Sequence, residues 1–199
     1  MKTTRMAPRS LVVAGCVAML GLASACNDGG DPRPSVDLRV QSVQAKAGGD
    51  SGTWASSLES DVLTRGRPLR DLGRLILTAT SFSPSPEVLT GHWNDVTLEK
   101  CEVRFWREDG HNVEGQDVPP GHVQSLDVRV PADAPGSTDI VFVLVPRAAK
   151  EEPPLADLSG AGQRLVEAVA ELAVHGRTTA GEAIVATARI PVRFADFAD

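Results

Sequence analysis

The three cysteines of this 199-residue chain are the residues whose positions best indicate what chemistry it can perform. Cys16 and Cys26 each follow small and apolar residues, and Cys101 lies far from both. Residues 1–9 carry three basic side chains and no acidic one, and residues 11–25 carry no charge. A basic start followed by an apolar stretch is typical of an export signal. Only five apolar residues directly precede Cys16, whereas fifteen uncharged residues precede Cys26, so Cys26 is the better candidate for a modified thiol.

The residues before Cys26 indicate lipid attachment. The run Leu22-Ala23-Ser24-Ala25-Cys26 resembles a bacterial lipobox, the recognition site of a lipoprotein signal peptidase. The resemblance implies that the Cys26 thiol receives a diacylglyceryl group and that residues 1–25 are removed as a lipoprotein signal peptide. Two acyl chains, palmitate among them, would hold the protein stably on a membrane. Two alternatives remain open: Val13-Ala14-Gly15-Cys16 is locally the better lipobox, and an ordinary secretory signal could end after Ala25.

The segment 26–34 connects this anchor to the rest of the chain. It is rich in Gly, Asp and Pro and is typical of a flexible tether, so we expect a folded domain over residues 35–199. Asn27 stands where an aspartate retains lipoproteins of some bacteria in the inner membrane, which favours the outer membrane. Without Cys16 and with Cys26 acylated, Cys101 is the last free thiol, so the domain cannot contain a disulfide.

The charge of the chain excludes several partners. The net charge is −6, and removal of residues 1–25 leaves 17 basic residues against 26 acidic ones. An acidic chain without basic clusters has no electrostatic footprint for nucleic acid. It also has no polybasic patch for anionic lipid, so the lipid would be its only membrane link. An envelope protein or a glycan is therefore the expected partner.

The sequence contains two candidate nucleophiles, Ser51 and Cys101, and the evidence for a catalytic role is weak for both. Gly49-Asp50-Ser51-Gly52 resembles the nucleophile motif of chymotrypsin-like proteases, whose catalytic histidine and aspartate precede the serine. In this chain all four histidines follow Ser51: His92, His111, His122 and His175. Cys101 shares its strand phase with Val103 and Phe105, which predicts burial rather than reactivity. We expect no catalytic residues.

Metal and sugar ligands are the remaining possibilities. Residues 109–117 collect acidic and amide side chains but lack EF-hand spacing, so a turn is the better interpretation and calcium stays an alternative. The histidines have no zinc-type spacing, and we expect no metal and no cofactor. Trp54 and Trp93 could stack on a sugar, although large apolar side chains in loops more often cover the ends of a core.

Period-2 alternation of apolar residues predicts a β-rich domain. The expected strands are residues 36–40, 72–79, 95–107, 122–130, 139–145, 168–174 and 184–194. The apolar phase shifts near Glu99-Lys100, which predicts a β-bulge. Residues 139–145 are apolar on both faces and should form the most buried strand. The region 44–70 is unusually long for a structureless loop, so we expect either short elements that periodicity does not place or a functional loop.

The last two strands are the clearest local signal. Residues 175–181 should turn between them, although Leu165, Val169 and Leu172 also satisfy helical spacing. Pro191 cannot donate to a ladder, which favours an edge position or a bulge for the last strand.

The stretch AELAVHGRTTAGEAIVATARIPVRF resembles the final hairpin of bacterial immunoglobulin-like and fibronectin-type modules. The chain departs from antibody domains in having no cysteine pair and no tyrosine, and in placing Trp106 out of phase with Phe105. We predict an all-β, antiparallel immunoglobulin-like sandwich of about seven strands. The resemblance implies a lipid-anchored, non-catalytic binding or structural module of the cell envelope. A carbohydrate-binding sandwich and, less favoured, a small envelope hydrolase are the alternatives.

Overall fold

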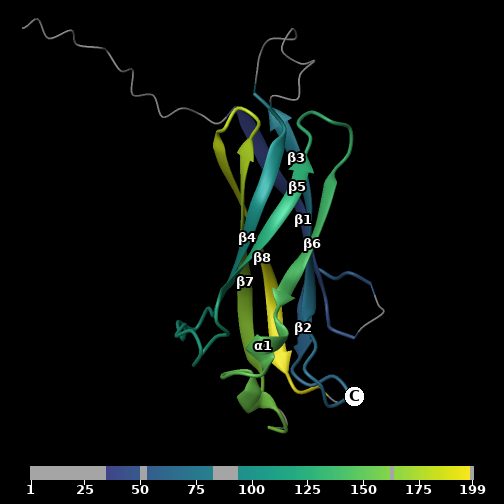
Figure 1. The fold of residues 1–199 in the computed structure, drawn as a ribbon. Coiled ribbons are helices and arrows are strands. Elements are labelled where there is room, and N and C mark those ends of the chain that lie inside the picture. The colour runs from purple at the N-terminus through teal and green to yellow at the C-terminus, as the bar shows by residue number, and fades with distance from the viewer. Residues whose placement is uncertain (1–34, 50–52, 83–93, 162–163, 198–199) are drawn as a thin grey trace, which may run out of the picture. The chain divides into compact units, whose positions relative to one another are not determined.

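The alternating segments build two β-sheets in the computed structural model, which describes residues 35–49, 53–82, 94–161 and 164–197. The elements are β1 (Val36–Lys46), β2 (Leu58–Asp61), β3 (Asp71–Ser81), β4 (Val96–Trp106), β5 (His122–Val130), β6 (Thr138–Val145), α1 (Arg147–Lys150), the 3-10 turn Ala156–Leu158, β7 (Val166–Thr178) and β8 (Ala183–Ala195). One sheet has the order β1-β3-β6 and the other β2-β8-β7-β4-β5 (Figure 1). Neighbours are antiparallel except β2 and β8, which are parallel. The prediction of an all-β fold is confirmed.

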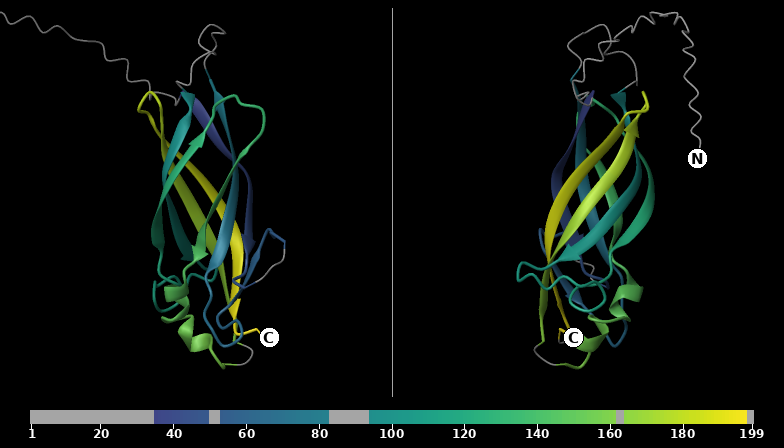
Figure 2. Two further views of the ribbon diagram at one scale, coloured as in Figure 1. Left: turned by 45° about the vertical axis from the view of Figure 1, so that its right-hand side comes forward. Right: turned by 90° about the vertical axis from the view of Figure 1, so that its left-hand side faces the viewer.

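The core lies between the inward faces of the two sheets. The five-stranded sheet is curled, and the three-stranded sheet lies against its inner side (Figure 2). Leu75 and Leu77 of β3 and Leu172 of β7 are completely buried. The rings of Phe105 and Phe194 meet edge to face, with centroids 5.8 Å apart. All described residues belong to the unit Arg33–Asp199. Among them, no helix is long and apolar enough to cross a membrane.

The expected bulge is present in β4. The register of β4 shifts between Leu98 and Lys100 against both of its neighbours, β5 and β7. Leu98 before the shift and Cys101 after it are both buried. An extra residue in one strand reverses the phase of the side chains that follow. The bulge therefore keeps apolar residues inward on both sides of the phase change.

The predicted C-terminal hairpin is confirmed, with a tighter turn. β7 continues through His175 to Thr178, so the expected turn over residues 175–181 was too long. The chain reverses through Thr179–Glu182, and Gly181 adopts a φ of +91°, which glycine accepts without steric strain. β7 begins at Val166, so the helical alternative for its entry is wrong. Cross-strand pairing with β8 outweighs the coincidental helical spacing.

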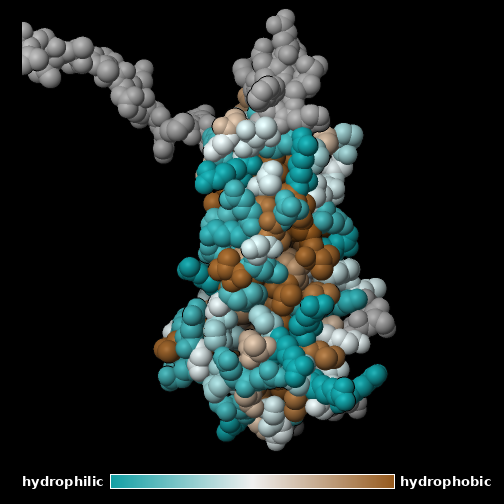
Figure 3. All heavy atoms as spheres, in the orientation of Figure 1, coloured by the Kyte–Doolittle hydropathy of each residue, from teal (hydrophilic) through white to brown (hydrophobic). Residues whose placement is uncertain are grey.

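The prediction that residues 139–145 form the most buried strand is wrong. They form β6, an edge strand of the three-stranded sheet, and Val141 on it is 55% exposed. An apolar run on both faces does not distinguish a central strand from an edge strand. Hydrophobic side chains reach the surface where β5 and β6 run side by side (Figure 3), and Val123 of β5 is 62% exposed.

A side chain links the edges of the two sheets at this position. The Gln124 amide donates to the Val143 carbonyl and accepts from the Val143 N–H, both at 3.0 Å. The amide thus bonds to β6 as the backbone of a neighbouring strand would. Free strand edges are templates for unwanted pairing, and this pair of bonds satisfies part of the β6 edge.

The region 44–70 contains a strand that periodicity did not place. β2 is only four residues long and pairs with β8 from Val192 onward. Pro191 precedes this pairing, so β8 has no neighbour from β2 at that residue. The prediction of an edge position or a bulge for the last strand is wrong, because β8 lies between β2 and β7 and pairs with β7 without a register shift. Pro191 is tolerated because the short β2 begins to pair only at the next residue.

Candidate functional site

Several predicted site residues lie outside the described part of the chain. These residues are Cys16, Cys26, Ser51, His92 and Trp93. The prediction of lipidation at Cys26 therefore stays a prediction.

The remaining histidines lie in three separate settings. His111 is exposed in the loop after β4, whereas His122 lies on β5 with Nε2 3.0 Å from the Val143 carbonyl oxygen. His175 lies on the outer face of β7, where Nε2 is 3.4 Å from a Glu102 carboxylate oxygen. Burial lowers the pKa of His122 below its ordinary value. Within the described ranges, no three His, Cys, Asp or Glu side chains gather to hold a metal ion.

Cys101 is buried, as its strand phase predicts. Its side chain is on the inner face of β4, and the residue is fully inaccessible. Burial, aided by the nearby Glu102 carboxylate, raises the pKa of the Cys101 thiol to about 12. Because the thiolate is the nucleophile, this thiol is unsuited to catalysis in the folded protein.

The acidic loop after β4 uses its oxygen atoms for its own turns. Asp109 is paired with Arg107 and accepts the His111 N–H at 3.1 Å. Asn112 Oδ1 accepts the Arg107 N–H at 2.5 Å, and Asp117 accepts the Val113 N–H at 3.0 Å. The Arg107 hydrogen bond lowers the pKa of Asp109. These contacts support the interpretation of residues 109–117 as a turn.

Trp54 has cations near its ring. Lys46 Nζ lies 5.8 Å and Arg74 Cζ 5.9 Å from the ring centroid, within cation–π range. Arg74 is also paired with Asp139. Trp54 therefore forms part of a side-chain cluster on the three-stranded sheet.

A different tryptophan lies on the outer face of the five-stranded sheet. Trp106 of β4 pairs in register with Val169 of β7, which pairs with Pro191 of β8. Their inward neighbours Phe105, Ala168 and Val192 are buried, so the three side chains point outward as one row. We call this set of three residues the apolar row.

Charged residues lie on both sides of the apolar row. On one side, the Arg189 guanidinium pairs with Glu171 at 2.8 Å and lies 5.4 Å from the Trp106 ring centroid. On the other side, Arg193 is 3.5 Å from Glu167 and 3.1 Å from Glu59 of β2. These ion pairs place hydrogen-bond donors and acceptors next to apolar surface.

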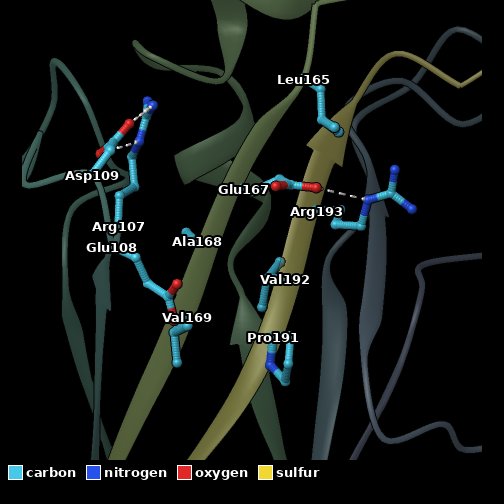
Figure 4. A pocket seen from close by; sticks show the side chains of 10 residues that line it. All are labelled: Arg107, Glu108, Asp109, Leu165, Glu167, Ala168, Val169, Pro191, Val192 and Arg193. Carbon is cyan, nitrogen blue, oxygen red and sulfur yellow. Dashed lines mark hydrogen bonds and ion pairs between the residues drawn. The ribbon is translucent and has the colours of Figure 1, made fainter.

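The row lines two hollows in the surface. The larger hollow, about 610 Å³, is bounded by the end of β4, by β7 and by β8 (Figure 4). Val169 and Pro191 lie along it, with the Glu167–Arg193 and Arg107–Asp109 pairs at its margins. The smaller hollow, about 410 Å³, is lined by Trp106, Arg189 and their neighbours. The two hollows share no lining residue and adjoin through the pairing of Trp106 with Val169. We call the two hollows together the outer groove.

A second polar cluster is completely buried. Lys150 of α1 and Asp71 of β3 are both fully inaccessible, with Nζ 2.9 Å from each carboxylate oxygen. Lys150 also donates to the Asp61 carbonyl at 2.7 Å. The Ser60 hydroxyl and the Gly48 N–H donate to Asp71 at 2.6 and 2.7 Å. Burial raises the pKa of Asp71, although the Lys150 charge and these hydrogen bonds oppose the shift.

Sequence reasoning missed both the apolar row and the buried pair. A signal for the row existed, because Trp106 is out of phase with Phe105 and therefore points outward. The pairing of Trp106 with Val169 was not visible, since it depends on which strands become neighbours. For Lys150 no local signal existed, because lysine is ordinarily exposed.

Comparisons with known proteins add little to this description. No protein-family model matches the chain, and no curated protein matches it. A solved structure described as "X-ray structure of Northeast Structural Genomics Consortium target SoR45" is similar with a TM-score of 0.36 and 11% identity. The match covers 81% of this chain and 86% of that chain. A likeness of this size carries no argument about function.

Proposed function

We propose that this chain is a lipid-anchored protein of the bacterial cell envelope whose immunoglobulin-like domain binds a partner, without catalysis, through the outer groove. The observation that carries the binding role is the apolar row with ion-paired side chains on both sides. Ligand sites combine an apolar surface with a few polar groups that fix orientation. The lipobox-like sequence ending at Cys26 supports the anchor and the envelope location.

The strand order supports the immunoglobulin-like assignment within this proposal. In immunoglobulin sandwiches, strands A, B and E share one sheet and C, F and G the other, with C′ added in variable-type domains. Here β1-β3-β6 correspond to A-B-E, and β8-β7-β4-β5 correspond to G-F-C-C′. β2 adds a short parallel strand beside G. The fold would thus provide a broad outer sheet face for binding.

Site-specific photo-crosslinking in living cells tests the binding role. A photoreactive phenylalanine analogue replaces Val169 in the apolar row or, as the matched control, Val185. Val185 also lies on the outer face of β8, is 53% exposed and does not line the outer groove. We expect a specific adduct from position 169 and none from position 185. Equal adducts from both positions, or none from either, would contradict the proposed role of the groove.

Lipid attachment has its own test. The intact mass of the protein extracted from membranes should correspond to cleavage before Cys26 with a diacylglyceryl group on its sulfur. Cys26→Ser should leave the membrane fraction or keep its signal peptide, whereas Cys16→Ser should be processed normally. An unmodified N-terminus on the membrane-extracted protein would contradict the anchor.

A further inference from the structure

The dimensions of the apolar row suit a flat, small ligand surface. Three side chains from adjacent strands form it, and strands lie about 4.8 Å apart, so the row extends about 10 Å across the sheet. Trp106 contributes an aromatic ring, and Pro191 a rigid ring without an N–H donor. A protein interface of standard size would need a much larger apolar centre.

The charges around the outer groove are nearly balanced. Its lining contains four arginines and five acidic residues: Arg104, Arg107, Arg189, Arg193, Glu108, Asp109, Glu114, Glu167 and Glu171. A polyanion or a polycation would meet like charges at many points along this lining. A neutral ligand with many hydroxyl groups meets none, because carboxylates accept and guanidinium groups donate hydrogen bonds.

We propose that the outer groove binds neutral glycans, with the apolar face of a pyranose ring on the Trp106–Val169–Pro191 row and its hydroxyl groups on the flanking ion pairs. This inference rests on the proposed binding role of the same groove and names its ligand class. It moves the sugar site from Trp54 and Trp93, which the sequence suggested, to Trp106.

The indole of Trp106 provides a further observation. Its Nε1–H is buried and has no hydrogen-bond partner among the described residues. Buried donors without a partner are uncommon and costly in folded proteins. A glycan hydroxyl that reaches this donor, after movement of the side chains that cover it, would satisfy it. Binding would then be sensitive to the indole and not only to aromatic surface.

Calorimetric titration of the full lipidated chain tests the ligand class. The protein is kept in a sugar-free zwitterionic detergent, and the probes are cellohexaose and chitohexaose, with polygalacturonate as a charged comparison. We expect saturable binding of at least one neutral hexasaccharide and weaker binding of the polyanion. Absence of binding to both neutral probes at millimolar concentration would overturn the proposal.

Variants locate the binding site. Trp106→Ala should weaken binding at least about tenfold, a typical loss for an anchoring aromatic residue. Trp106→Phe should keep part of the affinity, and Trp54→Ala, on the other sheet, should change it less than twofold. Pro191→Arg places a long charged side chain over the row at an exposed position and should abolish binding without unfolding the domain. Loss in Trp54→Ala but not in Trp106→Ala or Pro191→Arg would overturn the assignment.

The crosslinking and titration results separate the two proposals. If position 169 gives a protein adduct in cells but no glycan binds, the ligand class is wrong and the binding role stands. If position 169 gives a specific adduct, glycans bind and Pro191→Arg abolishes the binding, both proposals are supported. If neither a groove-specific adduct nor glycan binding is found, both fail.

Discussion

Two regions of this domain contain the same types of charged residue in opposite surroundings. Lys150 and Asp71 are paired where no water reaches either side chain. Arg193 and Glu167 are paired on the outer sheet face, with side chains 49% and 70% exposed. The buried pair joins α1 to β3 across 79 residues of chain, whereas the exposed pair joins adjacent strands that already share a ladder.

This difference separates stability from function. A buried ion pair gives little net stability over an apolar pair, but removal of one partner leaves an uncompensated charge and costs about 3–5 kcal/mol. An exposed pair contributes about 0–1 kcal/mol because water screens both charges. The buried pair is therefore important for folding stability. The exposed pairs contribute little to stability, so their side chains can form hydrogen bonds with a ligand at little cost to the fold.

The largest effect is expected from Lys150→Ala. The Asp71 carboxyl would stay in the interior without its cation or would have to take up a proton, so the unfolding free energy should fall by about 3–5 kcal/mol. Urea denaturation followed by tryptophan fluorescence measures this. Lys100→Ala is the control, because Lys100 is 44% exposed and pairs with Glu102, and its loss should stay below about 1 kcal/mol. Equal losses in the two variants would remove the distinction between the regions.

An apolar replacement of the whole buried pair should cost less. In Asp71→Leu combined with Lys150→Met, no charge is buried, so the loss should be about 1–2 kcal/mol smaller than in Lys150→Ala. Some loss should remain because Ser60 and Gly48 lose their acceptor. The same denaturation series, with the two single variants, forms a double-mutant cycle. Strictly additive losses would show that Asp71 and Lys150 do not act as a pair.

His122 is half-buried, so its exposure lies between that of the buried Lys150–Asp71 pair and that of the ion pairs on the outer sheet face. Its protonation should make the unfolding free energy depend on pH. Burial lowers its folded-state pKa, so below about pH 6.5 the unfolded chain takes up a proton that the folded chain resists. The unfolding free energy should therefore decrease as the pH falls from 7 to 5. In His122→Gln this decrease should be smaller. Parallel pH profiles for the two proteins would contradict a buried, neutral His122.

The smallest stability effect is expected from Arg193→Ala. Its two ion pairs are exposed, so the unfolding free energy should change by less than about 1 kcal/mol. Binding through the outer groove should nevertheless weaken, because the Arg193 donor lies at its margin. Denaturation and the glycan titration on the same preparation compare the two effects. A large stability loss with unchanged binding would reverse the roles assigned to the regions.

The strand positions were predictable because they depend on local alternation. The bulge between Leu98 and Lys100 followed from a phase change within one strand, and the final hairpin followed from two alternating runs around Gly181. β6 was misjudged because its sequence does not reveal which strands become its neighbours. β2 escaped prediction because four residues are too few for a period to show.

The candidate site was less predictable than the fold. Phase alone placed Trp106 outward and Cys101 inward, and the structure agrees with both. The sugar hypothesis nevertheless began with Trp54 and Trp93, because tryptophans in loops are conspicuous in a sequence. That Val169 and Pro191 extend the surface of Trp106 follows only from the order β4-β7-β8.

The sequence by itself determined the side-chain phase of the main strands, the all-β class and the candidate anchor at Cys26, because each depends on residues close together in the chain. Tertiary structure alone decided that β6 is an edge, that Lys150 reaches Asp71, and that three strands align Trp106, Val169 and Pro191. These contacts join residues far apart in the chain, and burial between the two sheets selects them. The residues next to each of these side chains in the sequence do not indicate which distant residues it contacts.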